Sequence, residues 1–126
     1  MSVKAVSKNV RISPRKVAIV ASLVRGRSVD DALVILEHTN RRSAQAVLKT
    51  IKSAKANALH NHNYTSKGLQ ISEISVTPGI SFKRYRPIAK GSANPFKRRS
   101  SHIRVVIDGT IREAKKTSTT KAKETK

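Results

Sequence analysis

A run near the C-terminal end of the chain decides the fold: residues 78–108 read PGISFKRYRPIAKGSANPFKRRSSHIRVVID. At its end, Ile103, Val105 and Ile107 recur at every second position, which is the pattern of a strand with one buried face. The part before them is rich in Lys, Arg, Pro and Gly and contains no acid. A segment of this kind is too long for an ordinary hairpin loop, so we predict that it has a function of its own.

The partner of this strand lies just upstream of the run. Leu69 and Ile71 alternate, and Ile74 and Val76 then alternate one position out of phase. A β-bulge at Ser72–Glu73 would produce such a slip. The two apolar runs therefore predict a pair of strands that are joined by the basic segment.

We predict that this basic segment, about residues 78–101, forms a long β-hairpin arm. If the arm is paired part of the way up, about twelve residues from Pro78 to the region of Lys90 would span roughly 40 Å at about 3.3 Å per residue. Such an arm would project well beyond a domain of this size. Because it has many cations and few bulky apolar residues, it needs an anionic environment.

Three helices are predicted between the N-terminal segment and the strands. The first begins at Ser13, a good N-cap, with Pro14 at its first position and Gly26 at its end. The second begins at Ser28 and fades near residues 38–40, and the third runs from about 41 to 60. Their apolar stripes follow the helical period and consist of Val17, Val20, Ala21 and Val24; Ala32, Leu33, Ile35 and Leu36; and Ala44, Val47, Leu48, Ile51, Ala54 and Ala58.

The chain of 126 residues suits one small domain. Residues 3–12 mix apolar and basic side chains and are predicted to be an extended edge segment. The predicted fold class is α/β, of the α+β kind: three helices packed on a small antiparallel sheet with a long protruding β-hairpin arm. Residues 1–110 form the domain, including the arm, and residues 111–126 form a basic low-complexity tail that we expect to be disordered.

The charge balance indicates a polyanionic partner. Lys and Arg number 27 against 7 acids, which gives a formal net charge of +20. Solubility alone needs a net charge of about 2–8 in a small domain. The surplus is concentrated in two acid-free segments, residues 1–27 and 83–104. Self-repulsion on this scale favours a nucleic acid partner, with an anionic membrane second.

The residues argue against an enzyme and against a cofactor or metal. Cysteine is absent, which excludes a thiol nucleophile and a Cys-ligated zinc. His60 and His62 stand two residues apart at a helix end, where their rings diverge, and no carboxylate or Cys completes a metal shell. There is no Gly-rich phosphate loop and no Ser/His/Asp triad. We expect no enzymatic activity, no cofactor and no metal.

No membrane segment is predicted either. No apolar run approaches the roughly 18 residues that a membrane span needs, and the N-terminus lacks the layout of a secretory signal. The apolar stripes of the helices are needed for a common core, which argues against a cationic membrane-surface peptide. We expect a soluble intracellular protein that contacts no membrane and forms no homo-oligomer.

The residues do not by themselves distinguish RNA from DNA as the partner. Aromatic residues make up only 3% of the chain, which argues against a stacking platform for single strands. Phe82, Tyr85 and Phe96 either stack on bases or brace the two legs of the arm. The binding mode that is left is recognition of the phosphate backbone and of the shape of the nucleic acid. It suits a structural component of a folded RNA and, as the alternative, an architectural DNA-binding protein with a basic β-arm.

Several motifs together resemble a single family. They are residues 13–26 (SPRKVAIVASLVRG), 33–40 (LVILEHTN), 54–62 (AKANALHNH) and 83–108 (KRYRPIAKGSANPFKRRSSHIRVVID). These stretches are similar to bacterial large-subunit ribosomal protein twenty-two, whose family lines the nascent-chain exit tunnel. The resemblance covers about residues 3–108 in colinear order.

The resemblance implies a structural constituent of the large subunit of the cytoplasmic ribosome. Such a protein would bind large-subunit ribosomal RNA, aid assembly and contact neighbouring ribosomal proteins. The tip of its arm would line the exit tunnel and meet the nascent peptide. The family pattern has arginine where Ile88 and Ser92 stand in this chain, so the tip would carry less charge here.

Two sets of site residues follow from this interpretation. The RNA-binding cations would be Lys4, Lys8, Arg11, Arg15, Lys16, Arg25, Arg27, Lys49, Lys52, Lys83, Arg84, Arg86, Lys90, Lys97, Arg98 and Arg99. The tunnel tip would be Pro87, Ile88, Ala89, Lys90, Gly91, Ser92 and Ala93.

Overall fold

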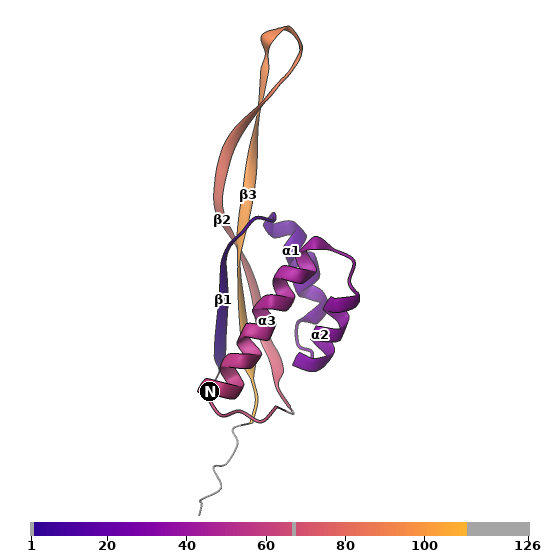
Figure 1. The fold of residues 1–126 in the computed structure, drawn as a ribbon, viewed down its shortest axis with the longest axis vertical. Coiled ribbons are helices and arrows are strands. Elements are labelled where there is room, and N and C mark those ends of the chain that lie inside the picture. The colour runs from indigo at the N-terminus through magenta and orange to yellow at the C-terminus, as the bar shows by residue number, and fades with distance from the viewer. Residues whose placement is uncertain (1, 67, 111–126) are drawn as a thin grey trace, which may run out of the picture.

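The computed structural model describes residues 2–66 and 68–110 and places three helices beside a sheet with a long arm (Figure 1). The predicted tail, residues 111–126, lies outside the described residues. In chain order the elements are β1 (Val3–Val10), α1 (Pro14–Val24), α2 (Val29–His38), α3 (Arg42–Asn61), β2 (Gln70–Pro87), a short 3₁₀ turn η1 (Ala89–Gly91) and β3 (Ala93–Asp108).

The sheet is antiparallel and has the order β1-β3-β2, so β3 is its central strand. Val105 pairs with Ala5 on one side and with Ile74 on the other, and all three side chains are buried. α3 packs on β1 and β3, α1 packs mainly on β2, and α2 packs on α3. The predicted α+β fold class is confirmed, and β1 is the edge strand that the sequence indicated.

The helix boundaries agree with the predicted punctuation, with one difference at the first cap. Ser28 caps α2: its Oγ accepts from the Asp31 backbone N–H at 3.2 Å and donates to Asp31 Oδ2 at 2.6 Å. Gly26 takes the left-handed conformation after α1, with φ of 73°. Ser13 occupies the N-cap position of α1, but its side chain makes no capping hydrogen bond. The Lys16 N–H that such a hydroxyl would accept from donates instead to the Ser13 carbonyl oxygen at 3.0 Å.

β2 and β3 form the predicted arm, and they stay paired to its end, where Pro87 lies opposite Ala93. Pairing therefore extends over the whole arm rather than part of it. The predicted bulge is confirmed, because the register of β2 shifts between Ile71 and Glu73. Figure 1 shows the arm rising far beyond the helices.

Two further bulges occur at the root of the arm, on both sides of β3. The register of β2 shifts between Pro78 and Ser81, and that of β1 shifts between Ser7 and Val10. The shift of β2 faces Ser100 and that of β1 faces His102, so both lie along the same short part of β3. Bulges bend a strand and increase its twist. The two bulges therefore bend the sheet at the point where the arm leaves the body.

Gly79 is needed in the bulge of β2 because β3 approaches it closely. A Cβ atom there would lie 2.6 Å from Ser100 Oγ and 3.2 Å from the His102 ring. That Ser100 hydroxyl donates to the Ile80 carbonyl oxygen at 2.6 Å. We expect Gly79→Ala to lower the free energy of unfolding by about 1–2 kcal/mol, since it displaces this hydrogen bond.

Urea unfolding of the single and double variants measures this effect. In a Ser100→Ala background the hydroxyl is gone, so Gly79→Ala is expected to cost less than it does in the natural chain. An equal cost in both backgrounds would show that the glycine is not required by its proximity to Ser100.

Candidate nucleic-acid interface

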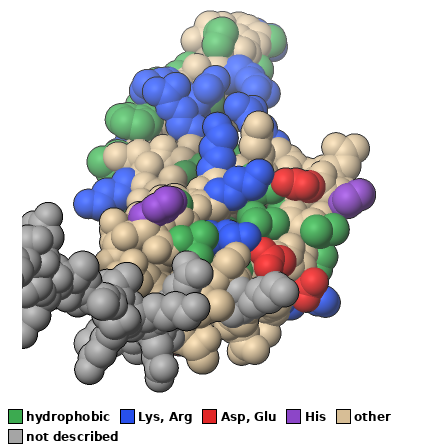
Figure 2. Space-filling model, turned by 60° about the horizontal axis from the view of Figure 1, so that its bottom comes forward, with side chains coloured by type: hydrophobic (Ala, Val, Ile, Leu, Met, Phe, Trp, Pro, Cys, Tyr) green, Lys and Arg blue, Asp and Glu red, His purple; other side chains and the backbone are tan. Residues whose placement is uncertain are grey.

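Positive and negative side chains occupy different parts of the molecule. Lys and Arg gather toward the arm, whereas acids lie on the body (Figure 2). The acids within residues 2–66 and 68–110 are Asp30, Asp31, Glu37, Glu73 and Asp108. The first three lie on α2, and the other two lie where β2 begins and β3 ends, far from the arm tip. The arm therefore has no carboxylate to neutralise its cations.

All sixteen predicted RNA-binding cations are exposed. One pair of arm cations also lies opposed across the ribbon. Lys83 pairs directly with Lys97, and no acid intervenes on either strand. Like charges in opposed positions destabilise a strand pair. An anionic partner would remove this repulsion, so the arm is built to be surrounded by negative charge.

A second basic surface forms where β1 ends and α3 begins. A cavity of about 450 Å³ there is lined by Arg11, Lys16, Arg41, Arg42 and Ser43, among others. A neighbouring cavity of about 280 Å³ shares Arg11 and Arg42 and adds Lys49. We call this the Arg11 surface; it consists of Arg11, Lys16, Arg41, Arg42 and Lys49.

Sequence reasoning missed part of the Arg11 surface. Arg41 and Arg42 were not predicted to bind RNA, although the helical period placed Arg42 on the polar side of its helix. They lie far from Arg11 in the chain, and only the packing of α3 against β1 brings them together. One signal in the sequence could have indicated them: they stand at the start of a helix whose first turn has no acid, and the positive end of a helix favours a bound anion.

Three of the predicted cations on the body have partners within the described residues, and on the arm the Arg84 guanidinium donates to the adjacent Lys83 carbonyl oxygen at 2.8 Å. Lys52 Nζ pairs with Glu37 Oε1 at 3.2 Å, and both side chains are about half exposed. The Arg25 guanidinium donates to the Ile74 carbonyl oxygen at 3.0 Å, and Arg27 Nε donates to the Leu23 carbonyl oxygen at 3.0 Å. Such interactions orient these side chains of the body, so they are weaker candidates than the cations of the arm and of the Arg11 surface.

The predicted tip residues lie together at the far end of the arm. The Ile88 N–H donates to the Ser92 carbonyl oxygen at 2.8 Å and closes the turn. Lys90 and Gly91 both have positive φ, of 59° and 74°. Every residue of the tip is exposed, including Ile88, which is 49% exposed. The turn thus exposes both an apolar side chain, Ile88, and a basic one, Lys90.

Neither a metal cluster nor a spanning helix is found in the part of the chain that the structure describes. No group of three His, Asp or Glu side chains in this part is arranged to hold a metal ion. None of its helices is long and apolar enough to cross a membrane.

Comparison with known proteins agrees with this architecture. The family described as "Ribosomal protein L22p/L17e" matches residues 5–108. A protein of Oceanobacillus iheyensis named "Large ribosomal subunit protein uL22" is 49% identical over 107 residues, which cover 85% of this chain and 95% of the relative. Proteins of the same name from Lactobacillus helveticus and Desulforamulus reducens are each 48% identical, over 84% and 85% of this chain and 91% and 95% of theirs. The chain belongs to the ribosomal protein L22p/L17e family.

Proposed function

We propose that this protein is a structural component of the large ribosomal subunit and binds its RNA. The relatives carry the name of a large-subunit protein, and the family is structural and non-enzymatic. This agrees with the prediction that the chain is no enzyme. Its place of action is the ribosome in the cytoplasm, in contact with large-subunit RNA and other ribosomal proteins. The observation that carries the proposal is the exposed, acid-free arm, on which Lys83 lies opposite Lys97.

RNA is favoured over duplex DNA as the partner. Family membership supports the ribosomal assignment, and nothing in the comparisons supports an architectural DNA-binding protein. In this proposal the phosphates of folded RNA enclose the arm and neutralise it. By holding separate RNA segments at the arm and at the body, the protein aids assembly of the subunit.

The RNA-binding residues proposed here fall into three groups. The arm contributes Lys90 at its tip and the cations of its two legs, from Lys83 to Arg86 and from Lys97 to Arg99. The Arg11 surface adds the cations around the start of α3. Lys4, Lys8 and Arg15 complete the set on β1 and α1, and Arg25, Arg27 and Lys52 are its weakest members because they have partners within the chain.

We propose that the tip, residues 87–93, lines the nascent-peptide exit tunnel and contacts the nascent peptide. Its position at the far end of the arm supports this assignment (Figure 1). Ile88 and Ser92 give the tip less positive charge than the family pattern would. We also propose that residues 1–110, arm included, act as a single domain separate from residues 111–126, and that the protein forms no homo-oligomer.

Sedimentation of a lysate tests the function. The protein is expected to co-sediment with large subunits in a gradient at low salt and to be stripped from them at high salt. A purified protein that prefers duplex DNA to a folded large-subunit RNA fragment in competition would favour the alternative. Light scattering of the purified protein, which is expected to give the mass of one chain, checks the absence of a homo-oligomer.

The arm is expected to be the least stable part of the free protein. From Ser81 to Arg99 it is a ribbon of two strands without a covered face, and such ribbons are marginally stable in water. In free protein, amide hydrogens of the arm should exchange far faster than those of Ile103 to Ile107, which lie in the core. In purified large subunits the arm should gain protection. Slow exchange along the arm of the free protein would contradict this.

A further inference from the structure

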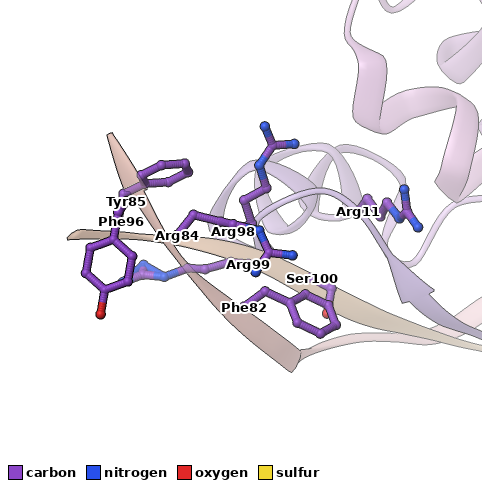
Figure 3. A pocket seen from close by; sticks show the side chains of 8 residues that line it. All are labelled: Arg11, Phe82, Arg84, Tyr85, Phe96, Arg98, Arg99 and Ser100. Atoms are coloured by element: carbon purple, nitrogen blue, oxygen red, sulfur yellow. The ribbon is translucent and has the colours of Figure 1, made fainter. Parts of the chain in front are cut away.

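The root of the arm carries a cleft whose lining differs from the rest of the basic surface. The cleft has a volume of about 750 Å³, within the range of ligand pockets. Its lining combines the guanidinium groups of Arg11, Arg84, Arg98 and Arg99 with the rings of Phe82, Tyr85 and Phe96 (Figure 3). The chain has only two Phe and two Tyr, so most of its Phe and Tyr side chains meet here.

These rings are not part of a core. Phe82 is 55% exposed and Phe96 is 38% exposed, whereas Tyr64, on the body, is buried. Aromatic side chains stabilise a fold mainly by burying their large apolar area. Rings held open to solvent on an arm of this charge are therefore available to a partner.

Arg and Phe alternate on one face of the ribbon. Phe82 lies opposite Arg98, and Arg84 lies opposite Phe96. Opposed residues of an antiparallel pair project to the same face, so each ring has a cation across from it. Along the strand, the Arg84 guanidinium lies 5.6 Å from the centroid of the Phe82 ring. We call these four residues the Arg–Phe face.

The other face of the arm has a different composition. It carries the opposed pair Lys83 and Lys97, together with Arg99 opposite Ser81 and Tyr85 opposite Pro95, although Arg99 and Tyr85 also line the cleft. Ammonium groups act on phosphates as point charges, whereas guanidinium groups bind phosphates in two-pronged geometry and stack on planar groups. Phosphate binding alone would not require rings on either face. The Arg–Phe face thus suits a ligand that offers a phosphate and a flat apolar surface together.

We infer that the cleft binds an unpaired nucleotide of RNA, with its base on the rings of Phe82 and Phe96 and its phosphate at Arg84 and Arg98. Arg11, which follows β1, is the lining residue that the body contributes (Figure 3). Bases inside an RNA duplex offer no free face for stacking, so the ligand is a bulged, looped or single-stranded nucleotide. This inference rests on the proposed function and names the RNA element that this cleft takes.

Binding of three RNA probes to the full-length protein tests the inference. The probes are a 12-nucleotide oligouridine, the same strand with abasic sites in place of the bases, and an RNA duplex of equal charge. We expect the oligouridine to bind tenfold to a hundredfold more tightly than the abasic strand, as stacking of one base gives. In Phe82→Leu/Phe96→Leu this difference should vanish, while binding of the abasic strand stays unchanged. Ile19→Leu, at an exposed apolar position on α1 outside the cleft, is the matched control and should keep the difference.

A second measurement reports on stacking directly. A 2-aminopurine placed within the oligouridine should lose fluorescence on binding to the natural chain and keep it on binding to Phe82→Leu/Phe96→Leu. Equal affinities of the natural chain for oligouridine and the abasic strand would overturn the inference but leave phosphate-led RNA binding intact. If the double variant also bound the abasic strand more weakly, the rings would brace the arm, and the inference would again be overturned. A natural chain that bound none of the three probes and no ribosomal RNA would overturn the proposed function itself.

Discussion

Replacing Lys97, Arg98 and Arg99 together with glutamine is expected to weaken binding of large-subunit RNA by about 10²- to 10³-fold, at roughly 1 kcal/mol or somewhat more for each phosphate that these side chains bind. These residues lie on one leg of the arm and are exposed, and no acid on the arm competes for them. Their replacement should not disturb the core, which β3 enters only from Ser100 onward. Filter binding measures the affinity, and circular dichroism should show unchanged helix content.

A control variant with the same reduction of charge separates local binding from total charge. Arg27, Lys52 and Lys55 are suitable because each has a partner within the chain: the Leu23 carbonyl oxygen, Glu37 and Asp30, respectively. Replacing these three with glutamine should weaken RNA binding by less than about tenfold, since Lys55 lies outside the proposed RNA-binding set, Arg27 and Lys52 are among its weakest members, and most of the loss is of long-range attraction. If both triple variants bound equally well, the arm would not be the principal RNA-binding region.

The affinity for RNA is expected to fall by about 10³- to 10⁵-fold between 50 and 200 mM salt, as it does for a protein that neutralises 6–10 phosphates. The physical reason is the release of condensed counterions from the RNA by bound Lys and Arg. A chain with a net charge of +20 and an acid-free arm has ample cations for this number. Titrations at four or five salt concentrations give the slope of log K against log salt, about −0.7 to −0.9 per phosphate.

The same titration of the Lys97, Arg98 and Arg99 variant provides an internal check. Its slope should be less steep by about two to three, because the variant neutralises up to three fewer phosphates. An affinity that does not depend on salt would contradict recognition led by phosphates. A steep slope that the triple variant leaves unchanged would place the phosphate-binding residues elsewhere, with the Arg11 surface as the first region to test.

The position of the arm in the fold explains how a small domain supports it. β3 is one continuous strand of 16 residues. Its second half lies in the core between β1 and β2, and its first half is a leg of the arm. The buried half fixes the direction of the exposed half, and the bulges beside His102 set the bend. The Asn9 N–H donates to His102 Nδ1 at 3.0 Å, which links the bulge of β1 to this level of β3.

Much of this architecture follows from short-range patterns in the sequence. Helix α2 begins at Ser28 because a hydroxyl followed three residues later by an acid makes a local cap. The slip from Ile71 to Ile74 reveals a bulge because side chains alternate along a strand. The arm can be predicted from the sequence because a run of cations without acids or bulky apolar residues cannot enter a core. In each case the residues that decide the outcome are neighbours in the chain.

Only the tertiary structure decided what depends on residues far apart in the chain. The sequence alone established an acid-free arm on a domain of three helices and a sheet. It did not give the order β1-β3-β2 or the second bulge of β2, where Ser100 and His102 approach Gly79 closely. It did not place Arg41 and Arg42 beside Arg11, or Phe82 opposite Arg98. These pairings follow from how strands align and how α3 packs on β1. Such pairings depend on contacts between residues that are far apart in the chain, so no short stretch of the sequence predicts them.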